Sequence, residues 1–301
     1  MRALVARRLD GPDAVEVIET AVPEPAAGQV RIKVAAAAVN PVDLAVSAGM
    51  PVKAGLSAAR AQFGLGWDVA GTTDAGTPVV GVADLLGREL KTHAEYVVLD
   101  EDQVTTAPTS VDLTHAATFG LNGLTALQAI RALRLQSGQT VLVTGAAGGV
   151  GGYAVQLAKH FGMTVVASAG ARDEHLVRQL GAEYFVDRAE DLAATVRRIA
   201  PVGVDGVVDA AVIGIGAQEA VRNGGRHAHL QGGPRPPHLR NITVEQVFIH
   251  SNHEDLRELV RLIDEGVLET RVADTYPLTD AAAAYKRLAE GGVRGRLVLV
   301  P

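Results

Sequence analysis

The strongest chemical signal in the sequence is a glycine-rich stretch, VTGAAGGVGGYAVQLAK, at residues 143–159. An apolar run leads into Ala146, Gly148 and Gly151 at A-x-G-x-x-G spacing, and a helical pattern follows. Such glycines allow close approach of backbone to a pyrophosphate and of helix to strand, and the helix N-terminus favours anions. The alternative is a tight turn that binds nothing. We predict a dinucleotide site, with the pyrophosphate held by Ala146, Ala147, Gly148, Gly149, Val150 and Gly151.

The end of the next predicted strand favours NADP(H) over NAD(H). An NAD enzyme would carry Asp or Glu there for the ribose 2′-hydroxyl, but Ser168 and Ala169 occupy the place. Arg172 follows closely, and a guanidinium suits a 2′-phosphate. The alternative is that Arg172 is a solvated side chain or pairs with Asp173.

The composition excludes several classes of protein. The 301 residues are 48% hydrophobic and 21% charged, which is enough for two folded domains and argues against disorder. There is no cysteine, so disulfides, thiol nucleophiles and cysteine zinc sites are excluded. A net charge of −6 disfavours nucleic-acid binding. We expect a cytoplasmic protein, because no apolar run is long enough to span a bilayer and MRALVARRLD lacks a signal-peptide core.

Two styles of sequence pattern predict two domains. Residues 1–110 hold short strands with period-2 alternation, as in VRIKV, which predict a partly open antiparallel barrel. From residue 111 strands and helices alternate, and this pattern predicts a doubly wound parallel sheet ending with the strand 242–250. We expect residues 111–250 to form the cofactor domain and 251–301 to return to the first domain.

An ordered set of motifs carries a family resemblance. These are VPEPAAGQVRIKVAAAAVNPVDL, GWDVAGT, HAEYVVL, FGLNGLTALQAI, the glycine-rich stretch, LGAEYFVD and VRGRLVLVP. The chain resembles the medium-chain dehydrogenase/reductase superfamily, and within it the zinc-free quinone oxidoreductases. The resemblance covers almost the whole chain. It implies a Rossmann sheet inserted into a GroES-like barrel, with Asn40 near nicotinamide and substrate and Thr125 near the nicotinamide ribose.

Departures from the superfamily's metal enzymes are informative. Zinc-dependent alcohol dehydrogenases carry a cysteine where this chain has Asn40, His-Glu where it has Trp67-Asp68, and a third ligand near Leu121. Their relay hydroxyl falls at Val42. The resemblance therefore implies no catalytic zinc here.

Asn40 and Asp43 are the candidate catalytic residues. They follow a predicted barrel strand in the sequence Asn-Pro-x-Asp. Two interpretations of Asp43 stay open: a proton relay, or a cap for the helix that begins at Pro41, which we favour because the pattern is a helix-start signal. Tyrosine proton donors of some enoyl reductases sit just past this segment, where this chain has none.

Histidines gather in the last third of the chain. His227 and His229 share a strand face, which could suit a metal, but no third ligand has suitable spacing and we expect no metal. The same strand end is the family's nicotinamide-facing wall. On that basis the predicted cofactor residues also include Arg188 beside the adenosine, and Ala211, His229, Gln231 and His250.

The leading hypothesis is an NADPH-dependent reductase of quinones or other conjugated carbonyls. An enoyl or enone reductase in biosynthesis, and a non-catalytic NADPH-binding sensor or structural protein, are the alternatives. We expect a homodimer through the edge strand 242–250, with Val244, Val247 and Ile249 unguarded by proline or lysine. The alternative is a monomer whose edge is covered by the loop 231–240.

Overall fold

A computed structural model describes residues 1–230, 232–233 and 235–301, and it divides into two compact units. Unit 1 comprises Met1–Leu121, His250–Gly266 and Thr270–Pro301. Unit 2 comprises Asn122–Ile249 and Val267–Glu269. Unit 1 is therefore built from chain on both sides of unit 2. The domain limits expected from the pattern change, at residues 110 and 250, stay a prediction.

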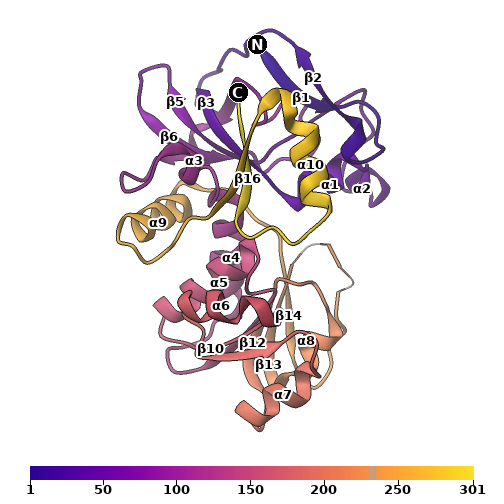
Figure 1. Ribbon diagram of the computed structural model, residues 1–301, viewed down its shortest axis with the longest axis vertical. Coiled ribbons are helices and arrows are strands. Elements are labelled where there is room, and N and C mark those ends of the chain that lie inside the picture. Colours follow the sequence, from indigo (N-terminus) through magenta and orange to yellow (C-terminus); the bar gives the residue numbers. More distant parts are fainter. Residues whose placement is uncertain (231, 234) are drawn as a thin grey trace. The chain divides into compact units, whose positions relative to one another are not determined.

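Unit 2 is organised around a parallel sheet with strand order β11-β10-β9-β12-β13-β14 (Figure 1). The strands are β9 (Thr140–Thr144), β10 (Thr164–Ala169), β11 (Tyr184–Asp187), β12 (Val204–Asp209), β13 (Val221–Leu230) and β14 (Thr243–Val247). The order reverses direction at β9, which is the doubly wound arrangement. The predicted fold class is confirmed.

The sequence of unit 2 explains why these strands lie inside. Val141, Leu142 and Val143 of β9 are fully buried, as expected for a central parallel strand covered on both faces. The helices are α4 (Gly120–Leu133), α5 (Gly149–His160), α6 (Glu174–Gln179), α7 (Leu192–Ile199) and α8 (Ile215–Glu219). No helix of the described chain is long and apolar enough to cross a bilayer.

Unit 1 is built on two sheets whose strands pair antiparallel, except that β15 and β16 run parallel. One sheet has the order β2-β1-β4; the other has the order β15-β16-β3-β5-β6-β8, with β7 also paired to β3. The strands are β1 (Arg2–Ala6), β2 (Val15–Glu19), β3 (Gln29–Val39), β4 (Phe63–Gly64), β5 (Asp68–Thr73), β6 (Pro78–Val82), β7 (Tyr96–Asp100), β8 (Val104–Thr106), β15 (Val272–Pro277) and β16 (Arg296–Val300).

Short helices complete unit 1. They are α1 (Pro41–Ser47), α2 (Met50–Lys53), α3 (Leu113–Ala116), α9 (His253–Asp264) and α10 (Ala281–Ala289). α10 contributes the fully buried Tyr285 to a core that also contains Leu4, Val39 and Leu297 (Figure 1). Chain from both ends of the sequence therefore closes one core around the segment that carries Asn40.

Two strands differ from their predicted extent. The strand predicted over 242–250 ends at Val247, because the chain then leaves the sheet and Ser251 N–H donates to Asp84 Oδ2 at 2.8 Å. The strand predicted over 93–99 begins at Tyr96. His93 lies outside it because its N–H donates to Leu65 O at 3.0 Å.

Candidate functional site

The first group of candidate residues lies where β3 passes into α1. Asn40 is the N-cap of α1 and Pro41 begins the helix. Asp43 Oδ2 accepts from Asn40 N–H at 2.8 Å, and its Oδ1 accepts from Gly66 N–H at 2.8 Å. Asp43 is fully buried, and both its oxygens bind backbone. These contacts are those of a cap that also ties α1 to the chain before β5.

Asp68 joins the three positions that bear zinc ligands in the metal enzymes of the superfamily. Its Oδ2 accepts from Asn40 Nδ2 at 2.8 Å, and its Oδ1 accepts from Leu121 N–H at 2.5 Å. Leu121 offers no ligating side chain, and the Asp68 oxygens already accept two hydrogen bonds. The residues present do not fit a zinc ion, and the carboxylate takes over the link between β3, β5 and α4.

The ionisation of Asp68 is set by its burial. Loss of hydration raises the pKa of Asp68 from 3.8 to about 6, and the charge of Asp43 adds to the rise. The hydrogen bonds from Leu121 and Asn40, and the charge of Arg296, oppose it. Asp68 is therefore mostly a carboxylate at pH 7 and neutral below about pH 6.

Lys91 is a second buried ionisable group in unit 1. Its Nζ lies 3.5 Å from the centroid of the Trp67 ring, and 4% of the residue is exposed. Burial lowers the pKa of Lys91 from 10.5 to about 7, although the carboxylates of Asp43, Asp84 and Asp68 favour its charged form. Lys91 is thus an amine that gains and loses a proton near neutral pH.

His93 and Tyr285 form a buried hydrogen-bonded pair beside this group. His93 Nε2 lies 3.0 Å from Ala38 O, and its Nδ1 lies 3.0 Å from Tyr285 Oη. A carbonyl can only accept, so Nε2 carries the proton and Nδ1 accepts from the tyrosine. Burial lowers the pKa of His93 and raises that of Tyr285 well above its usual value, so both stay neutral.

In unit 2 the glycine-rich turn has the geometry that a pyrophosphate needs. Gly148 is the N-cap of α5, and in the described chain no side chain caps this helix end. A Cβ at Gly151 would overlap Gly145 O, so only glycine allows α5 to start this close to β9. The backbone thus forms a bare helix N-terminus next to the strand end, and the turn fits a dinucleotide.

The residues predicted at the adenosine end follow β10 and β11. Ser168 is buried in β10, and Arg172 is exposed in the short helix Ala171–Asp173. The exposed Arg188 places its Nε 3.7 Å from where a Cβ of Gly170 would be. Two guanidinium groups therefore follow the strand ends at which a 2′-phosphate is expected.

The remaining predicted cofactor residues are dispersed. Thr125 is half-buried in α4, and Ala211 N–H donates to Thr144 Oγ1 at 3.0 Å. His229 is buried in β13, and burial lowers its pKa. His250 belongs to unit 1, where its exposed ring lies 3.5 Å from Asp84 Oδ2. Gln231 lies outside the described residues.

Comparisons with known proteins agree with this architecture. The family model for a zinc-binding dehydrogenase matches residues 180–299. A chloroplast envelope quinone oxidoreductase homolog of Arabidopsis thaliana is 30% identical over 97% of this chain and 95% of its own length. The chain belongs to the quinone oxidoreductase group of the medium-chain dehydrogenase/reductase superfamily.

Two further members of the superfamily show the range of described activities. An NADPH-dependent alkenal/one oxidoreductase of Arabidopsis thaliana is 28% identical over 100% of this chain and 80% of its own length. A solved structure described as an NAD-dependent alcohol dehydrogenase is 31% identical, has a TM-score of 0.87 and is matched over 100% of both chains. Both are oxidoreductases, and they differ in cofactor and substrate.

Some features of the site have no signal in the sequence. Lys91 stands in no motif, and its position over Trp67 joins residues of two separate segments. The bond between Asp68 and Leu121 joins β5 to α4 through a backbone N–H, which no residue type announces. By contrast, the cap formed by Asn40 and Asp43 was detectable, because its residues are three apart.

Proposed function

We propose that this protein is an NADPH-dependent reductase of quinones or other conjugated carbonyl compounds. Membership of the quinone oxidoreductase group supports the reaction class. The single observation that carries the proposal is the pairing, within one chain, of a bare α5 N-terminus with a barrel site that does not fit zinc. NADPH, when bound, supplies the hydride, and the acceptor must then be reactive without a metal.

The chain's own residues supply the proton. Reduction of a conjugated carbonyl adds one hydride to carbon and one proton to the resulting anion. Lys91 has a pKa of about 7, so it holds a proton at neutral pH and releases it readily. Asp68, with a pKa of about 6, stays ionised at pH 7 and favours the charged ammonium nearby. Asn40, fixed by Asp68, presents a polar group in the same site.

A steady-state screen tests the proposal. NADPH oxidation is followed with quinones, enones and enoyl thioesters as acceptors, and we expect turnover with the first two classes. Preference for enoyl thioesters would favour a biosynthetic enoyl reductase instead. NADPH binding without turnover of any acceptor would favour a sensor or structural protein.

The cofactor preference rests on the two arginines after β10 and β11. A charge-assisted phosphate contact contributes about 1.5–3 kcal/mol, roughly ten- to a hundredfold in affinity. We expect Arg172→Ala to weaken NADPH binding by this factor and to leave NADH binding unchanged. Arg178→Ala is the matched control, because Arg178 is exposed in the same unit and pairs with Glu174. Equal affinity of the parent protein for NADPH and NADH would contradict the assignment.

We also propose that the protein is a homodimer through β14. β14 is an edge strand, with one side of its backbone paired to β13. Phe248, which follows it, is 58% exposed. A twofold copy pairing edge to edge would satisfy free backbone groups and cover this ring.

A further inference from the structure

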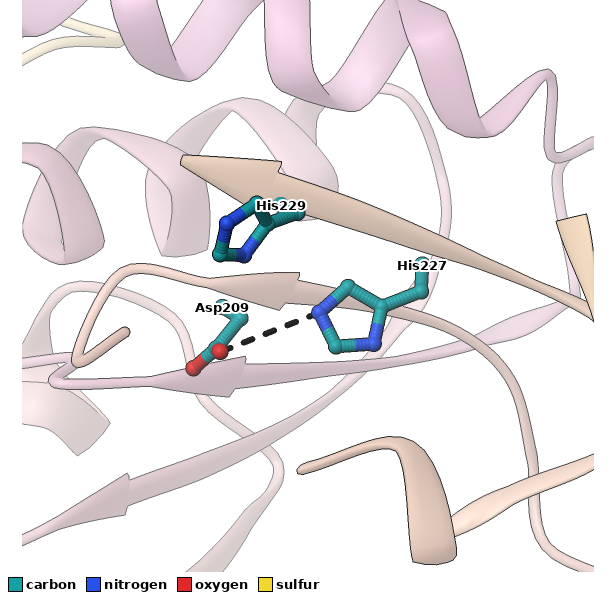
Figure 2. A group of neighbouring side chains, drawn as sticks. All are labelled: Asp209, His227 and His229. Atoms are coloured by element: carbon teal, nitrogen blue, oxygen red, sulfur yellow. Dashed lines mark ion pairs between the residues drawn. The ribbon is translucent and has the colours of Figure 1, made fainter. Parts of the chain in front are cut away.

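Three buried side chains meet at the carboxyl ends of β12 and β13. Asp209 on β12 is the register partner of His229 on β13, and His227 lies two residues before His229 on the same strand face. All three are fully buried (Figure 2). One oxygen or nitrogen of each lies within 4.8 Å of one from each of the others. The fold therefore supplies the third ligating residue that spacing along the chain did not reveal.

The imidazoles at this point are short of hydrogen bonds. Within the described residues neither ring nitrogen of His227 has a partner, and the 3.7 Å between its Nε2 and Asp209 Oδ2 is too long for a hydrogen bond (Figure 2). His229 Nδ1 is also without one. Buried polar atoms are nearly always satisfied, so three such nitrogens in one cluster indicate a ligand.

The hydrogen bond of the other His229 nitrogen determines where its lone pair lies. His229 Nε2 is 3.2 Å from Gly233 O, and a carbonyl only accepts, so Nε2 carries the proton. Nδ1 is then the atom with the free lone pair, and it is the unpartnered one. A histidine that donates one ring N–H to a backbone carbonyl and offers the other nitrogen is the usual form of a metal ligand.

Asp209 is held in place by groups outside the cluster. Its Oδ1 accepts from Thr144 Oγ1 at 2.7 Å and Ile213 N–H at 3.2 Å, and its Oδ2 accepts from Gly214 N–H at 2.7 Å. These donors orient the carboxylate, as outer partners of metal ligands do. Oδ2, with one such bond and a second lone pair, is also the oxygen that faces His227.

We propose that Asp209, His227 and His229 bind one Zn²⁺ ion, through Asp209 Oδ2, an imidazole nitrogen of His227 and Nδ1 of His229. Two nitrogens and one oxygen are a ligand set that zinc accepts, with a fourth position left for water. At bond lengths of about 2.0–2.2 Å the donor atoms come within roughly 3.3 Å of one another, so the side chains close by about an ångström. This site is separate from the barrel position around Asp68, which does not fit zinc.

Metal content and thermal stability test the site without NADPH or turnover. The chain, free of any histidine tag, is stripped with a chelator, incubated with ZnCl₂ and desalted before elemental analysis. We expect about one zinc per chain and a zinc-dependent rise in Tm. His227→Leu and His229→Leu should each lose the bound zinc and the rise in Tm. His175→Leu is the control, because His175 is exposed in the same unit, and it should retain both.

The leucine variants also separate zinc from a buried water or an unmet polar cost. Without a metal role, replacing His227 with leucine removes two unsatisfied nitrogens and raises the Tm to the same extent with and without zinc. With zinc bound, the parent protein gains stability that the variant does not. Substitution with Co²⁺ gives a second readout, since a tetrahedral site produces visible absorption. A parent protein that retains no stoichiometric zinc, or variants that retain it, would overturn the proposal.

Discussion

Burial moves the pKa values of Lys91 and Asp68 in opposite directions, toward the neutral form of each. The ammonium of Lys91 lies on Trp67 with the carboxylates of Asp43, Asp84 and Asp68 contributing to its potential, and its pKa is about 7. The carboxyl of Asp68 has a pKa of about 6. Both groups therefore change charge within a narrow range around neutral pH, where strongly shifted groups often mark functional sites.

The role of Lys91 is testable through the pH dependence of turnover. A proton source must be protonated, so we expect kcat to fall above about pH 7 in the parent protein. Lys91→Arg keeps a cation that does not deprotonate, and it should remove this fall while lowering kcat at pH 7. Lys33→Arg, on an exposed position of β3, is the control. A fall above pH 7 that persists in Lys91→Arg would assign the proton to another group.

Asp68 makes a prediction about stability. Its folded pKa is raised above the unfolded value, so the native state binds the proton more tightly and stability increases as the pH falls through 6 toward 4. At about 1.4 kcal/mol per pKa unit, ionised Asp68 costs about 3 kcal/mol at pH 8.

Asp68→Asn tests this cost, because the amide keeps the shape and an acceptor for Leu121 N–H. The variant should lose less unfolding free energy than the parent between pH 5 and pH 8, by about 3 kcal/mol in denaturant titrations. Glu19→Gln, at an exposed site of β2, is the control for a general charge effect. The same pH dependence in Asp68→Asn and the parent would contradict the raised pKa.

At the scale of elements, the contact between β9 and α5 depends on Gly151. Alanine there would place Cβ against Gly145 O, and backbone cannot move aside as a side chain can. We expect Gly151→Ala to destabilise the protein by about 3 kcal/mol and to abolish NADPH binding. Gly216→Ala in α8 meets open space and should stabilise by about 0.5–1 kcal/mol. Thermal unfolding and cofactor titration measure both effects.

The sequence predicted those elements whose signal is local. Apolar runs and glycine turns revealed the parallel strands, and the cap of α1 was detectable because Asn40 and Asp43 are three residues apart. Register was not predictable from the pattern. The neighbours Asp209 and His229 are 0% exposed and come from different strands, so no spacing rule connects them. Lys91 was missed for the same reason, since burial depends on the segments that fold around it.

At the scale of the whole molecule, the free edge of β14 decides the assembly. Val244 and Val247 are buried within the chain itself, and Arg235 Nη2 donates to Val244 O at 3.2 Å. Part of the edge is therefore covered by the loop 231–240, as the monomer hypothesis required. The proposed dimer depends on the exposed Phe248 and on the rest of the edge.

Phe248→Glu tests the dimer without disturbing the sheet, because the Phe248 ring is already exposed. A charge at a self-complementary contact meets its own copy, so we expect the parent to be a dimer and the variant a folded monomer by light scattering at micromolar concentration. Tyr184→Glu, on the opposite edge strand β11, is the control and should stay dimeric. A monomeric parent protein would refute the dimer.

The carboxylate bridge of Asp68 also imposes an order on any attempt to engineer a catalytic metal centre into this barrel. Cysteine at Leu121 keeps the backbone N–H that Asp68 uses, so that change is nearly neutral as a first step. Cysteine at Asn40 removes the amide donor from a buried charge, and histidine at Trp67 removes the ring beneath Lys91. Each of these later steps costs stability before any ion can repay it. The metal-free state is thus protected by a barrier in sequence space, and only a simultaneous set of exchanges would cross it.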